Sequence, residues 1–364
     1  MKHNPKLLVV GNLLGKNPGY VTTQGQILAE RLEADGFEVV AVSAKVNKFA
    51  RLLDVVRTIV KSSGRVDLMI LEVYSGPAFL LADVASFVAK LLGIPSVLVL
   101  HGGQLPQFAA KHSRWVRRIL GRARSLVAPS AFLAESLERF ASPIRVIPNA
   151  IDLGAYRFRL REEMAPRMLW MRSFHPLYNP RLALDVLALV KGEFPDATLV
   201  MGGVDKGLES SVKNSAREMG LGDSVRFPGF LDEAAKAREF SDADIFLNTN
   251  RVDNMPVSVV EACAFGLPVV ATDVGGLSKL VAHGENAILV NDDDPEEMAK
   301  AVIGLLKDPG AARRFSENGR KLAERSSWSS VRQQWESLFE DILLKTESPA
   351  SEKGSGSLTE RLSR

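Results

Sequence analysis

Short apolar runs rich in β-branched residues recur along the whole chain and alternate with segments that have the length and amphipathic pattern of helices. Six runs fall in the first half: KLLVVGN, FEVVAVS, DLMILEVY, SVLVLHGG, SLVAPS and IRVIPN. Six more follow: RMLWMRS, ATLVMGG, SVRFPGF, ADIFLNTN, PVVATDVGG and AILVN. Continuous apolar strands are typical of parallel sheets that helices cover on both faces. The pattern therefore predicts two doubly wound α/β domains.

Charge and turn residues interrupt this periodicity in DLGAYRFRLREEMAPR, which sets the expected domain boundary. We expect Rossmann-like domains over residues 1–160 and 161–325, facing one another across a cleft. Residues 326–345 predict an amphipathic helix that returns to the N-terminal domain. Residues 346–364 have too little apolar content to order themselves and predict a disordered tail. Ligands of such sheets bind outside the carboxyl ends of the strands, so the loops there are the candidate site.

Length and composition agree with two globular domains. The chain has 364 residues, more than one hydrophobic core usually covers, and 46% are hydrophobic and 24% charged. The single cysteine, Cys263, excludes an internal disulfide and a Cys-rich metal site, and it fits a reducing compartment. No segment reaches about 18 uncharged apolar residues, and the N-terminus lacks the features of a signal peptide. We expect a cytoplasmic protein that does not span a membrane.

Charge is distributed unevenly along the chain. Residues 1–160 hold 21 Lys and Arg against 11 Asp and Glu, a net charge of +10, whereas the remainder holds 25 against 32, a net charge of −7. Many basic residues lie in two amphipathic segments, 45–61 and 111–124. Such segments suit the surface of an anionic membrane, and a merely solvated basic face is the alternative. Nucleic-acid binding is not expected, because no recognition module accompanies the charge.

The segment DNMPVSVVEACAFGLPVVATDVGG holds two acids eight positions apart, Asp253 and Glu261. Pro256 lies near the first turn of a predicted helix, where unpaired amide groups form an anion site that suits a diphosphate. Asp253 precedes this helix, and Glu261 lies inside it, within reach of a polar group such as a ribose. The pattern describes a clamp for a nucleotide-diphosphate sugar. The alternative is that Asp253 caps the helix and Glu261 is a solvated acid.

This segment resembles the donor-site signature of retaining glycosyltransferases with two facing Rossmann-like domains, the GT-B fold, and specifically of glycosyltransferase family 4. That signature is an acid, seven residues, Glu, a small-residue segment, Gly-x-Pro-Val-Val and a Gly-Gly turn. Three other segments are similar to family segments in the same order: VLHGGQLPQF, VAPSAFLAESL and VIPNAIDL. The resemblance covers roughly residues 6–344.

The resemblance implies roles for residues of the C-terminal domain. Glu261 would hold the ribose hydroxyls, and Asp253 would contact a hydroxyl of the transferred sugar. Arg172 would bind the diphosphate, a contact to which its planar guanidinium is suited. Backbone amides at the helix start would bind sugar and diphosphate, and these residues are Met255, Pro256, Val257 and Ser258.

Two positions of the N-terminal domain also match the family. His101 corresponds to the histidine that faces the reacting sugar, and the neighbouring glycines let a ligand approach the backbone closely. A hydrogen-bonded histidine at a strand end is the alternative. Gly19 lies in the loop that approaches donor and acceptor, although this loop could also be only a flexible turn.

Two departures from the family pattern stand out. The first acid is Asp253 where Glu is commoner. The family's Lys a few residues after Arg172 is missing from RSFHPLYNPRLAL, so that Arg181 or the helix N-terminus would have to supply the charge.

The resemblance implies a retaining glycosyltransferase that moves a sugar from a nucleotide-diphosphate sugar to a lipid-linked or polysaccharide acceptor, without a cofactor or metal, in cell-surface glycan synthesis. A nucleotide-sugar epimerase of similar fold and a catalytically weak nucleotide-sugar-binding scaffold are the alternatives. The acid run NDDDPEEMAK predicts a helix start capped by Asp294, not a metal site.

Overall fold

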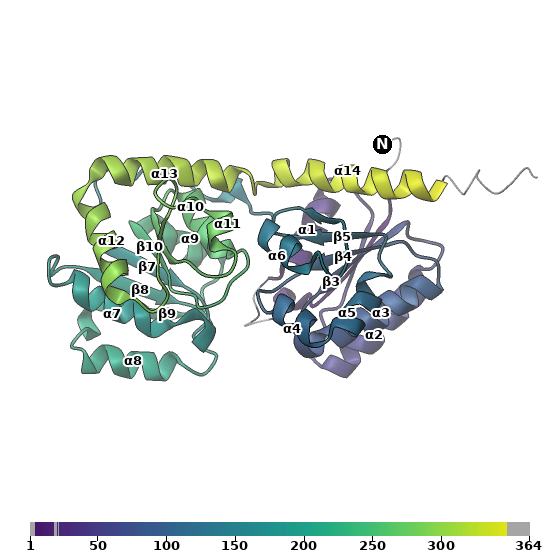
Figure 1. Cartoon of the computed structure of the whole chain (residues 1–364), viewed down its shortest axis with the longest axis horizontal. Helices are drawn as coiled ribbons and strands as arrows, with labels where there is room; N and C mark the ends of the chain where they lie inside the picture. Colours follow the sequence, from purple (N-terminus) through teal and green to yellow (C-terminus); the bar gives the residue numbers. More distant parts are fainter. Residues whose placement is uncertain (1–3, 18–19, 21, 348–364) are drawn as a thin grey trace, which may run out of the picture.

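The computed structural model describes residues 4–17, 20 and 22–347, which form two six-stranded sheets in which neighbouring strands are parallel (Figure 1). Helices separate consecutive strands and cover both faces of each sheet. The prediction of two doubly wound α/β domains is therefore confirmed.

The first sheet has the strand order β2-β1-β3-β4-β5-β6. Its strands are β1 (Leu7–Val10), β2 (Val39–Val42), β3 (Leu68–Val73), β4 (Ser96–Leu100), β5 (Ser125–Ala128) and β6 (Ile144–Val146). Its helices are α1 (Gln24–Ala34), α2 (Lys48–Ser62), α3 (Phe79–Leu91), α4 (Leu105–Lys111), α5 (Ser113–Leu120) and α6 (Ala131–Leu137). Every residue of β1, β3 and β4 is buried, which explains why these strands are almost continuously apolar.

The second sheet has the order β12-β11-β10-β7-β8-β9. Its strands are β7 (Arg167–Met171), β8 (Thr198–Gly202), β9 (Val225–Gly229), β10 (Ile245–Asn248), β11 (Val269–Thr272) and β12 (Ile288–Val290). Its helices are α7 (Pro180–Val190), α8 (Glu209–Glu218), α9 (Glu233–Asp242), α10 (Val257–Phe265), α11 (Leu277–Leu280), α12 (Pro295–Lys307) and α13 (Pro309–Glu324). Asp294 caps α12 by accepting a hydrogen bond of 2.8 Å from the amide of Glu297, as the sequence indicated.

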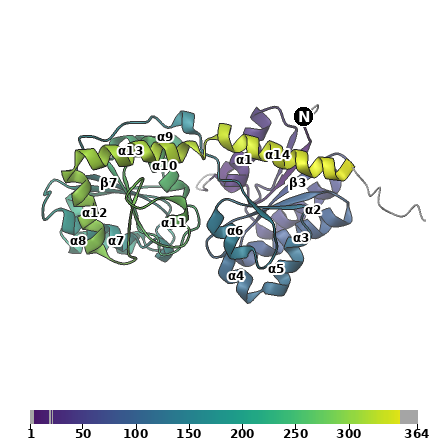
Figure 2. The ribbon, with the colours of Figure 1, turned by 45° about the horizontal axis from the view of Figure 1, so that its top comes forward.

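The last helix, α14 (Trp328–Glu347), packs against the first sheet although it follows the second in the chain (Figure 2). Its apolar side chains join the core formed by β1, β3, β4 and α1. These side chains are Val331, Trp335, Leu338, Phe339 and Ile342. The indole of Trp328 also donates a 2.7 Å hydrogen bond to Asp35. Thr346 and Glu347, which the sequence places in the tail, belong to α14, and residues 348–364 lie outside the described part of the chain.

Each sheet has one point at which the strand order reverses. In the first sheet this point lies between β1 and β3, and in the second it lies between β7 and β10. Loops diverge to opposite faces there, and a crevice opens outside the carboxyl ends of the strands. The loops after β1, β3, β7 and β10 therefore occupy the favoured ligand positions of the two domains.

Candidate active site

The residues assigned to the donor gather at the switch point of the second sheet. Arg172 directly follows β7, and the segment 249–256 runs from the end of β10 into α10. Helix α10 carries Ser258 and Glu261 near its start. Because β7 and β10 are hydrogen-bonded neighbours, the topology brings these side chains to one edge of the sheet.

Arg172 and Asp253 form an ion pair with each other, although the family resemblance assigns them to two different parts of the ligand, the diphosphate and the sugar. Both are largely buried, with 17% and 14% of their side chains exposed. Asn250 braces the pair, since its amide donates to Asp253 at 2.6 Å and accepts from the Nε of Arg172 at 3.3 Å. The guanidinium also lies over the ring of Tyr178, 4.6 Å from its centroid. A cation and an anion are thus held ready beside the helix start.

The loop that carries Asp253 rests on the glycine turn of the sequence motif. The amide of Gly276 donates a 3.0 Å hydrogen bond to the carbonyl of Asp253. Gly275 has a φ of +58°, and a Cβ there would lie 1.9 Å from the same carbonyl oxygen. The positive φ and the close approach of Gly275 require glycine, because a side chain would be strained by the backbone and would displace the loop.

The start of α10 presents polar groups without protein partners. The N-cap residue is Pro256, and no side chain caps the helix, so Asp253 is not its cap. Instead, the Asp253 carboxylate accepts from the amide of Asn254 at 2.7 Å. The buried Ser258 hydroxyl has no hydrogen-bond partner within the described residues. Free amides and a free hydroxyl at a helix start suit an anionic ligand.

Glu261 is buried and not the solvated acid of the alternative interpretation. Its Oε1 accepts hydrogen bonds from the Tyr156 hydroxyl at 2.9 Å and from the Lys236 ammonium at 2.8 Å. Both bonds end on the same oxygen, which fixes the orientation of the carboxylate. Sequence reasoning missed both partners, because Lys236 lies 25 residues and Tyr156 lies 105 residues away in the chain.

The suggestion that Arg181 replaces the missing lysine is wrong. Arg181 is half exposed on α7 and bonds to Asp185 one turn later and to Ser215 of α8. The first turn of α7 directs this side chain toward α8 instead of the switch point. Lys236 is the cation that the structure places beside Glu261, and only 18% of its side chain is exposed.

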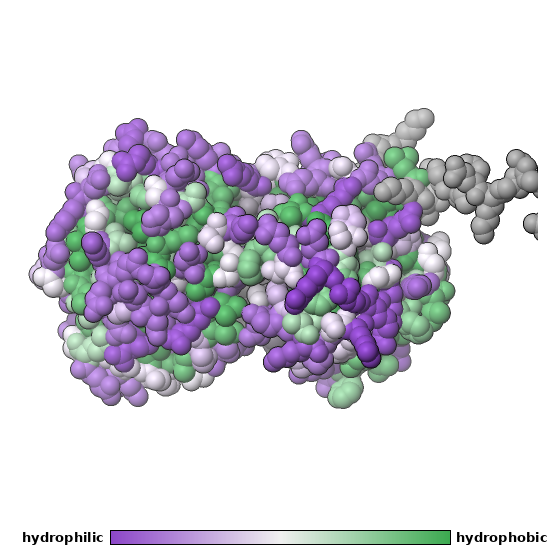
Figure 3. Space-filling view, viewed as in Figure 1, coloured by the Kyte–Doolittle hydropathy of each residue, from purple (hydrophilic) through white to green (hydrophobic). Residues whose placement is uncertain are grey.

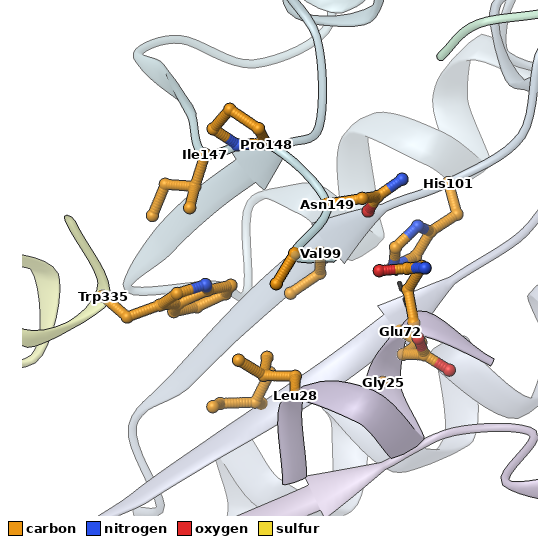
Figure 4. Close-up of a pocket in the computed structure, with 12 residues that line it drawn as sticks. Gly25, Leu28, Glu72, Val99, His101, Ile147, Pro148, Asn149 and Trp335 are labelled. Carbon is orange, nitrogen blue, oxygen red and sulfur yellow. Dashed lines mark ion pairs between the residues drawn. The ribbon is translucent and has the colours of Figure 1, made fainter. Parts of the chain in front are cut away.

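His101 lies directly after β4 in the first sheet, next to a carboxylate that the sequence did not single out (Figure 4). Its Nε2 is 3.4 Å from Oε1 of Glu72 on β3, and its ring stacks on Tyr74 at 4.9 Å. His101 and Glu72 line a cavity of about 30 Å³ that Asn149 and Trp335 also border. Burial lowers the pKa of His101 to about 4 and raises the pKa of Glu72 to about 7. Gly19 lies outside the described residues.

The carboxyl-end loops of the two domains touch. A Cβ on Gly103, two residues after His101, would lie 3.4 Å from the Cα of Asp253. The hydroxyl of Ser130, at the start of α6, donates to Asn254 in the same loop. The histidine loop of one domain and the acid loop of the other therefore form one composite site.

Known proteins are similar to this chain in sequence and in fold. A family model described as Glycosyl transferases group 1 matches residues 155–322, and one described as Glycosyltransferase Family 4 matches residues 23–155. D-inositol 3-phosphate glycosyltransferase 2 of Catenulispora acidiphila is 31% identical over 237 residues, or 59% of this chain and 55% of the relative. A phosphatidyl-myo-inositol mannosyltransferase of Mycobacterium leprae is 28% identical over 63% of this chain and 61% of its own length. The chain thus spans less than two thirds of these relatives.

The crystal structure of the Anabaena protein HepE, in complex with UDP and glucose, has the same two-domain GT-B fold. It aligns with a TM-score of 0.72 and 17% identity and covers 93% of this chain and 100% of its own. With family models that together extend from residue 23 to residue 322, and with the donor motif at the switch point, this chain belongs to glycosyltransferase family 4.

Proposed function

We propose that the protein is a retaining glycosyltransferase that moves a sugar from a nucleotide-diphosphate sugar to a lipid-linked or polysaccharide acceptor in cell-surface glycan synthesis. The observation that carries this proposal is the composite site: Asp253, which pairs with Arg172 near Glu261, lies in a loop that meets the His101 loop of the other domain. Relatives named for inositol-based acceptors and a neighbour that holds UDP and glucose support this choice of substrates.

In this proposal the diphosphate lies between Arg172 and the start of α10. The guanidinium and the free helix amides stabilise the negative charge that develops on the leaving group. The Oε2 of Glu261 faces the ribose, since Oε1 already accepts two hydrogen bonds. Lys236 supplies the second positive charge that the family pattern otherwise lacks.

The transfer itself is a substitution on one face of the sugar. The bond from the anomeric carbon to the diphosphate oxygen breaks, and the acceptor oxygen forms its bond on the same side. The acceptor proton passes to an oxygen of the leaving diphosphate. The protein contributes positioning and electrostatic stabilisation, and the anomeric configuration is retained.

Donor binding exchanges the partners of Arg172. The diphosphate replaces Asp253 as the partner of the guanidinium. The Asp253 carboxylate then accepts a hydrogen bond from a hydroxyl of the sugar. Because the two charges neutralise each other in the free protein, little unpaired charge is buried before the donor arrives.

A panel of nucleotide sugars tests this proposal, with nucleotide release and sugar configuration followed in the presence of excess chelator. We expect nucleotide release that an acceptor extract stimulates and that chelator leaves unchanged, because Arg172 and the helix start carry the diphosphate. Epimerised donor would indicate the epimerase, and binding without turnover would indicate the scaffold. Loss of transfer on chelation, with rescue by magnesium or manganese, would overturn metal independence.

We also propose peripheral docking on the inner face of an anionic membrane, where a lipid-linked acceptor would lie. Helices α2 and α3 lie side by side and expose apolar side chains at the margin of the first domain, where Figure 3 shows apolar patches among polar ones. We call these side chains the apolar ridge. The ridge consists of Phe49, Leu53, Val60, Leu80, Phe87 and Leu91. Exposed cations border it, namely Lys45, Lys48, Arg57, Lys61 and Lys90. Apolar insertion flanked by positive charge is the pattern of interfacial helices.

The second predicted basic segment contributes less to this surface. Arg118 and Arg122 both pair with Asp83, and Arg122 is only 11% exposed. Across the described part of the chain, none of the helices has both the length and the apolar character needed to cross a membrane.

A further inference from the structure

Glu72 is a buried carboxylate that the proposed mechanism does not use. It lies at the switch point of the first sheet, near the end of β3, and 1% of its side chain is exposed. Its Oε2 has no hydrogen-bond partner among the described residues. The backbone amides of Asn12 and Gly25 approach the carboxylate and offset part of the free-energy cost of burying it, and the cost that remains indicates a role beyond packing.

Two glycines make room for this carboxylate. A Cβ on Gly11, after β1, would lie 2.3 Å from Oε2 of Glu72. A Cβ on Gly25, in the first turn of α1, would lie 2.3 Å from its Cδ. The backbone at both ends of the β1–α1 loop therefore encloses the carboxyl group. This enclosure keeps the carboxyl group on the side of β4, the strand that His101 follows.

On the side of β4, the carboxyl group of Glu72 lies next to the ring of His101. Oε1 lies 3.4 Å from Nε2 of the ring (Figure 4). The stacked ring of Tyr74, inclined by 17°, holds the imidazole plane. The Tyr74 hydroxyl contacts the same oxygen at 3.4 Å. Nδ1 of His101 has no hydrogen-bond partner within the part of the chain that the structure describes. In a neutral imidazole one nitrogen donates and the other accepts, so the partner of Nε2 decides what Nδ1 can do.

We propose that Glu72 is a positioning residue that selects the tautomer of His101. When Glu72 is ionised, it accepts from Nε2–H, and Nδ1 is left as a hydrogen-bond acceptor. When Glu72 is protonated, it donates to Nε2, and the imidazole proton sits on Nδ1 as a donor. The tautomer choice follows from the contacts, whereas its effect on the reacting sugar rests on the proposed function, with His101 facing that sugar as the family resemblance implies.

The electrostatics of the pair allow this change near neutral pH. Burial raises the pKa of Glu72 to about 7 and lowers the pKa of His101 to about 4, so the imidazole stays neutral while the carboxyl group titrates. Tyr74 and His101 are the titratable groups that face Glu72. From the described part of the β1–α1 loop and the first turn of α1, the backbone amides of Asn12 and Gly25 face the carboxyl group. Burial raises the pKa of Tyr74 well above its usual value, so its hydroxyl also stays neutral.

Histidine nitrogen NMR tests this proposal without any substrate. The full chain contains 5 histidines, and a His101→Gln variant assigns the ring signals of His101. We expect the ring proton to move from Nδ1 at about pH 5.5 to Nε2 at about pH 8.5. Glu72→Gln should hold one tautomer at both pH values, and Tyr74→Phe should still switch.

An unchanged tautomer in the wild type, or a switch in Glu72→Gln that matches the wild type, would overturn the proposal. Because no donor is present, failure here would leave the glycosyltransferase proposal standing. Inactivity with all donors would equally leave the tautomer result unaffected.

Discussion

The ion pair between Arg172 and Asp253 is the residue contact that changes the interpretation of the site most. Sequence similarity assigns these side chains to the diphosphate and to the sugar, but the free protein joins them and braces them through Asn250. In the proposed function, an arriving diphosphate would therefore compete with Asp253 for the guanidinium. The acid would be released toward the sugar only once the phosphate is bound.

This exchange predicts opposite effects for the two acids of the motif. In these predictions UDP stands for the nucleoside diphosphate of the donor that the panel identifies. Glu261→Ala should weaken UDP binding by about tenfold or more, because a hydrogen bond to a charged group contributes about 1.5–3 kcal/mol. Asp253→Ala should leave UDP affinity unchanged or improved, because Arg172 is then free, and should abolish transfer. Titration calorimetry with UDP measures both affinities. Equal losses of affinity in the two variants contradict the division of roles.

Lys236 offers a second residue-level prediction. Lys236→Met should weaken UDP binding by about tenfold and uridine binding less, because the ammonium acts on the phosphates as well as on Glu261. Lys213→Met is the matched control, since Lys213 pairs with Glu209 on α8, away from the switch point. Equal losses for UDP and uridine would reduce Lys236 to a support for the Glu261 carboxylate.

At the scale of elements, the turn at Gly275 and Gly276 explains why the acid loop holds its position. Gly275→Ala places a Cβ against the Asp253 carbonyl. Gly284 also has a positive φ, +79°, but a Cβ there would meet no atom within 4 Å. We expect Gly284→Ala to lower the free energy of unfolding by about 1–2 kcal/mol and Gly275→Ala to lower it further. Only Gly275→Ala should also weaken UDP binding. Urea unfolding measures the stability of the two variants, and titration calorimetry measures their UDP affinity. If the two variants do not differ in either measurement, the turn does not have this role.

Helices α2 and α3 carry the element-level prediction for membrane docking. The double variant Phe49→Asp and Leu53→Asp should lose co-sedimentation with anionic vesicles, because it removes apolar area and adds negative charge. Leu189→Asp is the control, since Leu189 is also an exposed apolar side chain, at 42%, but lies on α7 of the other domain. Higher salt should weaken docking of the wild type. Wild type that stays in the supernatant at low salt would favour a soluble acceptor.

At the scale of the whole molecule, the sequence predicted both sheets, because buried parallel strands carry a nearly continuous apolar signal. It also singled out Arg172, Asp253, Ser258 and Glu261, which the structure brings together at one switch point; the last three lie within one strand-end loop and the next helix. It missed contacts between distant segments, such as Glu261 with Lys236. It placed Glu72 inside an apolar strand without assigning it a role. Such contacts depend on strand order, and periodicity along one strand does not determine that order.

The two basic segments also show what the sequence alone does not determine, namely which side chains are exposed. Charge counting located the basic half correctly, but it could not distinguish arginines that face solvent from those tied to Asp83. Nor did it predict the apolar ridge, because exposed apolar residues on α2 and α3 resemble core positions in an amphipathic pattern. Burial separates these groups only once the neighbouring helices are in place.

The central claim is that two carboxyl-end loops, one from each domain, hold a nucleotide-diphosphate sugar and transfer its sugar with retention. The most direct measurement is time-resolved proton NMR of the sugar released from an α-linked donor that the panel identifies, before the anomers equilibrate. The account predicts that the α anomer appears first and that Arg172→Ala abolishes its release. First appearance of the β anomer, or release that persists unchanged in Arg172→Ala, would contradict it.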